Sequence, residues 1–200
     1  MRRRIDRLAC LVALVAFVGA TNLLAQSDSS HSFKSVKVSQ ALLRQLLAEG
    51  FARSKTFRRL VDGLDASDWL VFVQPGPCPE KAAVACLLHT VAEFEGSPYV
   101  RVLVNFNHRH PDNVIATLAH ELQHALEVAQ DPNVKDTATM RALFERIGTV
   151  RVRSGSATTY ETDGARRIGE QVLRELGAAP KTRGDKLAAK REDRSDPSNP

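Results

Sequence analysis

The sequence lacks an apolar run long enough to cross a membrane. Its most apolar stretch, residues 8–20, has about 13 residues and follows a head with four arginines, whereas a spanning helix needs roughly 20. A basic head and a short apolar centre are typical of a secretory signal, and small residues allow cleavage after Ala20 or Ala25. We therefore predict a signal peptide over residues 1–25 and a secreted or periplasmic protein; the alternative is an uncleaved anchor.

A basic surface is also lacking, although the formal net charge is +5. Residues 1–25 carry a net +3 and residues 177–200 a net +2, so the body between them is neutral. The body has no basic stripe with interleaved aromatic residues, the feature that marks many nucleic-acid-binding surfaces. Nucleic acid is not an expected partner, and a membrane is expected only if the N-terminal segment stays uncleaved.

Cysteine is scarce, with 3 in 200 residues. Cys10 lies inside the predicted signal, which leaves Cys78 and Cys86 in the mature chain. In an oxidising compartment a disulfide is the expected state of such a nearby pair. The alternative is that both are small, buried apolar side chains.

No internal repeat is evident, and the composition indicates one domain between two polar segments. A polar linker over residues 26–38 and a disordered polar tail over residues 178–200 flank a stretch of about 140 residues, enough for one domain with one core. We place that domain at residues 39–177.

Hydrophobic periodicity predicts an α+β domain with a small sheet of three or more strands. The expected helices cover residues 39–60 with Ser39 as cap, 112–130 with Asp112 as cap, 137–148 and 160–176, and the expected strands cover residues 69–74, 84–94 and 99–106. Val100, Val102 and Val104 alternate with more polar residues, so one face of the last strand can be buried. If its edge is open, an extended peptide could pair with it.

The most informative motif is His120-Glu121-Leu122-Gln123-His124, in the predicted helix 112–130. Residues four apart on a helix share a face, so both imidazoles can bind one cation. Glu121 can hold a water on that cation. The alternative is that the two histidines only decorate a solvated helix face.

A catalytic zinc ion usually has three protein ligands and a water, so the motif needs one more ligand. Glu127 shares the histidines' face but rises roughly 10 Å beyond His120, too far for one ion. Glu161 falls on the apolar stripe of the helix expected over residues 160–176, where a carboxylate is costly unless it is paired. Its alternative role is a capping box with Thr158.

The motif helix resembles the active-site helix of zincin metallopeptidases, and residues 160–176 resemble the gluzincin pattern, in which a Glu on a later helix completes the site. The sequence departs from that pattern at Gly164 and Ala165, where many gluzincins have an Asp. The zincin version with a third His is absent, since Gln130 stands in its place. A thiolate from Cys86 is a further candidate ligand, because peptide deformylases likewise combine an upstream Cys-Leu pair, here Cys86-Leu87, with a His-Glu-x-x-His helix. The Glu-Gly that precedes the Cys in deformylases is missing from this sequence.

The resemblance implies a zincin-like metallopeptidase that hydrolyses a peptide or protein substrate. Zn²⁺ would be held by His120, His124 and Glu161, with Glu121 as general base. Tyr160 is a candidate stabiliser of the transition state, as are His108, Arg109 and His110 by proximity in sequence. The alternative is a secreted zinc-binding or protein-interaction domain that keeps the motif helix and has no catalytic activity.

Overall fold

The structure, a computed structural model, describes residues 32–80, 82–106, 110–154 and 157–177. The predicted signal peptide and the polar tail from residue 178 lie outside these residues. Within them, none of the helices combines the length and the apolar character that a membrane span requires.

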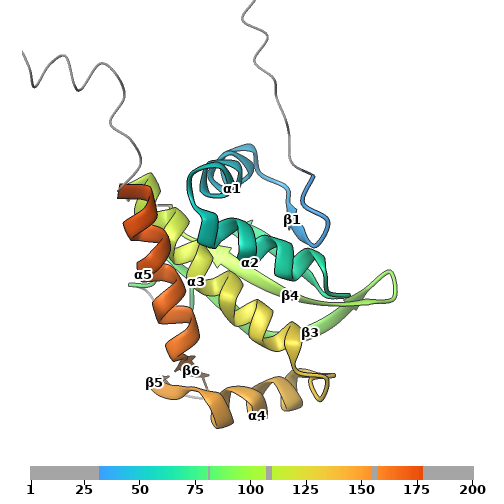
Figure 1. Ribbon diagram of the computed structural model, residues 1–200. Coiled ribbons are helices and arrows are strands. Elements are labelled where there is room, and N and C mark those ends of the chain that lie inside the picture. The colour runs from blue at the N-terminus through green and yellow to red at the C-terminus, as the bar shows by residue number, and fades with distance from the viewer. Residues whose placement is uncertain (1–31, 81, 107–109, 155–156, 178–200) are drawn as a thin grey trace, which may run out of the picture. The chain divides into compact units, whose positions relative to one another are not determined.

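The described part of the chain is an α+β domain, as the periodicity predicts (Figure 1). In chain order its elements are β1 (Val36–Val38), α1 (Ala41–Arg53), α2 (Lys55–Asp65), β2 (Leu70–Pro75), β3 (Ala85–Phe94), β4 (Ser97–Val104), α3 (Pro111–Gln130), α4 (Thr137–Ile147), β5 (Thr149–Ser154), β6 (Ala157–Glu161) and α5 (Asp163–Gly177).

The main sheet has four strands in the order β1-β2-β4-β3, with β3 antiparallel and the others parallel. Its inner face is built by alternate valines that are 0% exposed: Val71 and Val73 in β2, and Val100, Val102 and Val104 in β4. Helices α1, α2 and α3 cover this face (Figure 1). Burial of branched side chains on one face fixes the strand register, because a slip by one residue would expose all of them.

The condition for peptide pairing at residues 99–106, an open strand edge, is not met. Strand β4 is bonded to β2 on one side and to β3 on the other. The sequence pattern did not predict β1, whose three residues extend the sheet beyond β2. The edge that lies nearest the motif helix therefore belongs to β3.

The single helix expected over residues 39–60 is two helices. Ser54 separates them with an extended backbone, and its side chain accepts a hydrogen bond from the Phe57 amide at the start of α2. A serine that caps a new helix offers its backbone an alternative to continuing the old one. At the start of α1, Gln40 rather than Ser39 is the cap residue, and it makes no side-chain cap bond.

Helix α3, which carries the motif, begins one residue earlier than expected. Its cap is His110 rather than Asp112: the His110 ring accepts a hydrogen bond from the Asp112 amide, and Pro111 occupies the first turn. The Asp112 carboxylate is bonded instead to Arg53 at the end of α1, with 2.8 Å between Nη1 and Oδ1. Asp112 therefore forms an ion pair with a residue distant in sequence and does not cap the helix.

Strands β5 and β6 form a hairpin where the sequence pattern suggested the start of a helix. Tyr160 pairs with Val150 across the hairpin, and Glu161 is the last residue of β6. The helix begins only after Thr162, whose hydroxyl accepts a hydrogen bond from the Ala165 amide. Glu161 is thus at the end of a strand, and its alternative role in a capping box with Thr158 is wrong.

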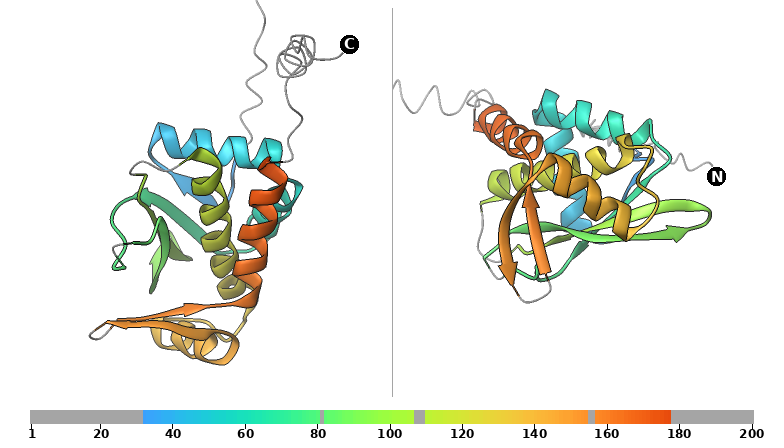
Figure 2. Two further views of the ribbon diagram at one scale, coloured as in Figure 1. Left: turned by 90° about the vertical axis from the view of Figure 1, so that its left-hand side faces the viewer. Right: turned by 90° about the horizontal axis from the view of Figure 1, so that it is seen from below.

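Helix α5 lies beside α3 along much of its length (Figure 2). The close approach depends on Gly169, where an added Cβ atom would lie 3.3 Å from the Ala116 carbonyl oxygen and 3.3 Å from the His120 Cβ atom. The far end of α5 is fixed to α2 by Glu175. Its carboxylate accepts hydrogen bonds from the Ser54 hydroxyl at 2.7 Å, the Thr56 amide at 3.0 Å and the Thr56 hydroxyl at 2.8 Å.

We expect Glu175 to make the stability of the fold depend on pH. Burial opposes its charge, but hydrogen bonds from Gln171, Ser54 and Thr56 outweigh burial and lower its pKa from 4.5 to about 2. A lowered pKa means that the charged form stabilises the fold, fully above the ordinary pKa and less as pH falls toward 2. Glu175→Gln should therefore cost about 1–3 kcal/mol of unfolding free energy at neutral pH.

Urea denaturation at a series of pH values tests this prediction. The gap between wild type and Glu175→Gln should narrow as the pH is lowered from 4.5 toward 2. Glu170→Gln, on the exposed side of the same helix, is the matched control and should change stability by less than about 0.5 kcal/mol. A gap that stays constant with pH would contradict the role assigned to the Glu175 charge.

Candidate metal site

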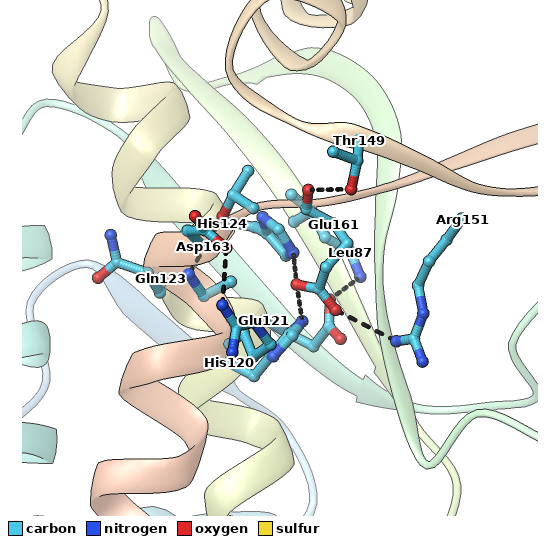
Figure 3. Close-up of polar contacts among 12 residues, drawn as sticks. Leu87, His120, Glu121, Gln123, His124, Thr149, Arg151, Glu161 and Asp163 are labelled. Atoms are coloured by element: carbon cyan, nitrogen blue, oxygen red, sulfur yellow. Dashed lines mark hydrogen bonds and ion pairs between the residues drawn. The ribbon is translucent and has the colours of Figure 1, made fainter.

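Three side chains from two distant segments meet beside α3 (Figure 3). His120 and His124 come from successive turns of α3, and Glu161 comes from the end of β6. One ligand atom from each lies within 4.8 Å of the others. The group is close enough to hold a metal ion, and its residues are the three that the sequence analysis selected.

One oxygen of Glu161 faces both imidazoles. Glu161 Oε1 is 3.3 Å from His120 Nε2 and 4.0 Å from His124 Nε2. This oxygen is buried and has no hydrogen-bond partner among the described residues. A buried carboxylate oxygen without a partner costs free energy, and a cation bound between the three donors would remove that cost. The residues therefore fit a metal ion.

The second oxygen of Glu161 is engaged by Arg151 of the β5–β6 hairpin. Arg151 Nη1 donates to Glu161 Oε2 at 3.2 Å (Figure 3). The arginine side chain is 65% exposed, whereas that of Glu161 is 16% exposed. The two oxygens thus have different surroundings: Oε2 is bonded to the exposed Arg151, and Oε1 faces the two histidines. This difference favours a single carboxylate oxygen as ligand.

The pKa values of the two histidines are shifted in opposite directions. Burial, together with the charges of His124 and Arg151, lowers the pKa of His120 to about 4, so its ring is neutral at physiological pH. Burial also acts to lower the pKa of His124, but hydrogen bonding to Glu127 and the nearby carboxylates outweigh it and raise the pKa. Metal binding requires neutral imidazoles. Burial therefore favours the metal-binding form of His120, whereas the carboxylates around His124 favour its protonated form.

Glu121 lines the smaller cavity together with the three donors and, like His124, is buried. Its Oε2 atom accepts a hydrogen bond of 2.7 Å from the Leu87 amide on the edge of β3. Burial raises its pKa above the ordinary value. A carboxylate of this kind holds a proton more strongly than an exposed one, which is the property required of a general base.

The site opens into two cavities that share His120, Glu121 and Glu161. The smaller has a volume of about 240 Å³ and lies between the start of β3, α3, α4 and the hairpin. The larger, of about 640 Å³, extends along α5 past Gly169 and Leu173. The three candidate ligands thus border open space on two sides.

Tyr160 lines the smaller cavity, but its hydroxyl donates to Glu145 Oε1 at 3.1 Å. His110 caps α3 with a side chain that is 69% exposed and does not line either cavity. The remaining two candidates, His108 and Arg109, lie outside the described residues.

His89 also lies at the site, although no sequence motif identifies it. Its ring stacks on Phe144 at 5.1 Å and on Tyr160 at 5.6 Å, in the wall of the smaller cavity. Burial, followed by the charges of His124 and Arg141, lowers its pKa to about 4, so the ring is neutral. Strand alternation contained a signal for this position, since His89 is two residues from the buried Leu87 and shares its face.

Cys78 and Cys86 form a disulfide that joins the turn after β2 to β3. A thiolate ligand from Cys86 is therefore not available. The bridged loop contributes Glu80 and Ala83 to both cavities. The disulfide thus holds one wall of the site in place.

The edge of β3 is partly closed to a pairing peptide. The Leu87 amide is bonded to Glu121, and the Val91 amide donates to the Thr137 hydroxyl at the start of α4 with a length of 3.1 Å. Helix α4 lies along this part of the strand (Figure 1). Two amides along this edge are thus already bonded to side chains of α3 and α4.

In comparisons with protein-family models, with curated proteins and with solved structures, the chain has no match.

Proposed function

We propose that this protein is a secreted or periplasmic zinc metallopeptidase of the zincin type, with gluzincin-like ligands His120, His124 and Glu161. The observation that carries the proposal is the buried Glu161 Oε1 atom. It faces two imidazole nitrogens and accepts no hydrogen bond from any residue that the structure describes, and the Glu121 carboxylate lies beside them. The motif helix packed on a mixed sheet, and a third ligand from a later segment, support a zincin-like arrangement.

Zinc is the metal that this donor set favours. Two imidazoles and one carboxylate are usual zinc ligands, and three protein ligands leave a fourth position for water. A structural zinc site would close that position with a fourth protein ligand. Here the space beside the three donors is cavity, and the Glu121 carboxylate that also lines it is bonded to the Leu87 amide.

When bound, zinc lowers the pKa of a water from 15.7 toward about 7 and polarises a scissile carbonyl. Glu121 accepts the proton of the attacking water and passes it to the leaving amine. Its Oε2 atom is held by the Leu87 amide, which leaves Oε1 to carry the proton.

The developing oxyanion needs a donor from the protein. Arg151 and His89 line the cavity, whereas Tyr160 would first have to release Glu145.

Location outside the cytoplasm is part of the proposal. The basic head and short apolar run of residues 1–25 support a secretory signal. The Cys78–Cys86 disulfide supports an oxidising compartment.

The mature protein, purified without added metal, is expected to contain about one zinc ion per chain. His124→Ala should lose most of this zinc because one of three ligands is gone. Atomic emission spectroscopy on both proteins measures the stoichiometry, and circular dichroism checks that the variant is folded. A folded wild type that neither contains nor takes up zinc would refute the proposed cofactor.

Glu121→Gln is expected to keep its zinc and its fold and to lose turnover by about 10²–10⁴-fold, because the amide cannot accept the proton. The side-chain oxygen of the introduced Gln can still accept the hydrogen bond from the Leu87 amide. Since burial raises the pKa of Glu121, its charge destabilises the fold above that pKa, and removing it should not lower stability.

Cleavage of an unstructured protein substrate, measured by mass spectrometry, gives the rates for this test. Asp62→Asn, on the exposed side of α2, is the matched carboxylate-to-amide control and should cleave like wild type. A zinc-loaded Glu121→Gln that cleaves at the wild-type rate would remove Glu121 as base. If zinc binds and no substrate is cleaved by wild type, the protein is the non-catalytic zinc-binding domain instead.

A further inference from the structure

We propose that Glu127 is the residue that orients His124 for metal binding, and that it acts as a hydrogen-bond partner rather than as a ligand. This inference rests on the metal site of the proposed function. It concerns how the site is held, and it assigns this role to a residue of α3 itself.

The Glu127 carboxylate lies behind His124, on the side of the ring away from the other donors. Its Oε2 atom is 3.2 Å from His124 Nδ1, whereas the Nε2 atom of the same ring is the one nearest to Glu161. The two side chains are 13% and 6% exposed. Glu127 is therefore a buried carboxylate in contact with the nitrogen that does not face the metal position.

A carboxylate in this place selects the tautomer of His124. A charged carboxylate only accepts hydrogen bonds, so the ring proton must sit on Nδ1 to make the contact favourable. Nε2 then presents its lone pair toward His120 and Glu161. Metal-bound histidines commonly donate their second N–H to a carboxylate, and loss of such a partner weakens metal binding by about 10–100-fold.

The same carboxylate also fixes the segment that carries the third ligand. The Thr162 hydroxyl lies 2.9 Å from Glu127 Oε1 and 3.1 Å from Oε2, and it accepts a hydrogen bond from the Ala165 amide. Thr162 is buried and directly follows Glu161. The Glu127 side chain thus fixes both the ring of His124 and the start of α5.

Gly164 provides the room for this arrangement. A Cβ atom at that position would lie 2.5 Å from Glu127 Oε1, closer than any real contact of that kind. The departure from the gluzincin pattern at Gly164 then has a physical reason. The space that an acidic side chain from α5 would need is occupied by the carboxylate that α3 supplies.

Glu127→Gln and Gly164→Ala test the proposal without removing a ligand. In the first, a neutral amide replaces the carboxylate; in the second, a methyl group displaces it. Both should weaken zinc binding by about 10–100-fold, measured by competition with a chromophoric chelator. Gln123→Ala is the matched control, because its amide also contacts Glu127 Oε1, at 3.4 Å, but does not touch His124; its affinity should stay within about twofold of wild type.

The tautomer provides a readout that a merely structural role would not change. Long-range ¹H–¹⁵N NMR of the zinc-loaded protein should show the His124 proton on Nδ1 in wild type, and a weakened or exchanging Nδ1 proton in Glu127→Gln. The thermal midpoint of the metal-free variants identifies any that do not fold, and Gly164→Ala serves if Glu127→Gln fails.

The outcomes separate this inference from the function on which it rests. If wild type binds zinc and both variants bind it as tightly, Glu127 has no positioning role and the inference is overturned. A proton found on Nε2 in the metal-free wild type, at mildly alkaline pH, would overturn it as well. If wild type does not bind zinc, the proposed function fails first.

Discussion

The site depends on one arrangement: a buried carboxylate oxygen that has no hydrogen-bond partner within the described part of the chain is held against two imidazole nitrogens. Glu161 Oε1 lies 3.3 Å from one ring and 4.0 Å from the other, and burial alone would make this arrangement unfavourable. It persists because the surrounding elements fix each donor separately. A cation bound between the three donors would convert the same geometry from a cost into a binding site, and under the proposed function the surrounding elements support that ion.

That support comes from elements on three sides. Arg151 of the hairpin engages the second oxygen of Glu161, and Glu127 of the motif helix contacts the ring of His124 and the hydroxyl of Thr162. Helix α5 can lie against α3 because Gly169 has no side chain, and Glu175 fixes its other end to α2. The three candidate ligands are thus held by hydrogen bonds behind them, as the ligands of metal sites commonly are.

Local pattern predicted the motif helix well, and the tertiary arrangement poorly. Apolar periodicity and the Pro-Asp start placed α3 to within one residue, and the cost of an unpaired carboxylate on an apolar stripe selected Glu161. The predicted secondary structure of Glu161 was wrong, however, because this residue ends strand β6 and does not lie in a helix. Tyr160 pairs with Val150 across a hairpin that local periodicity did not predict. The parallel pairing of β1 with β2 and the helix break at Ser54, whose hydroxyl donates to Glu175, rest on contacts between residues far apart in sequence. Such contacts leave no periodic signal.

X-ray absorption at the zinc edge of the loaded protein tests the central claim most directly, because it reports the type and distance of the bound atoms. The proposed site predicts two imidazole nitrogens and carboxylate or water oxygen at about 2.0–2.2 Å, with no sulfur. Replacing Glu161 with Ala should reduce the oxygen contribution and leave both imidazoles. A first shell that contains sulfur at about 2.3 Å, or that lacks two imidazoles, would contradict the site described for this protein.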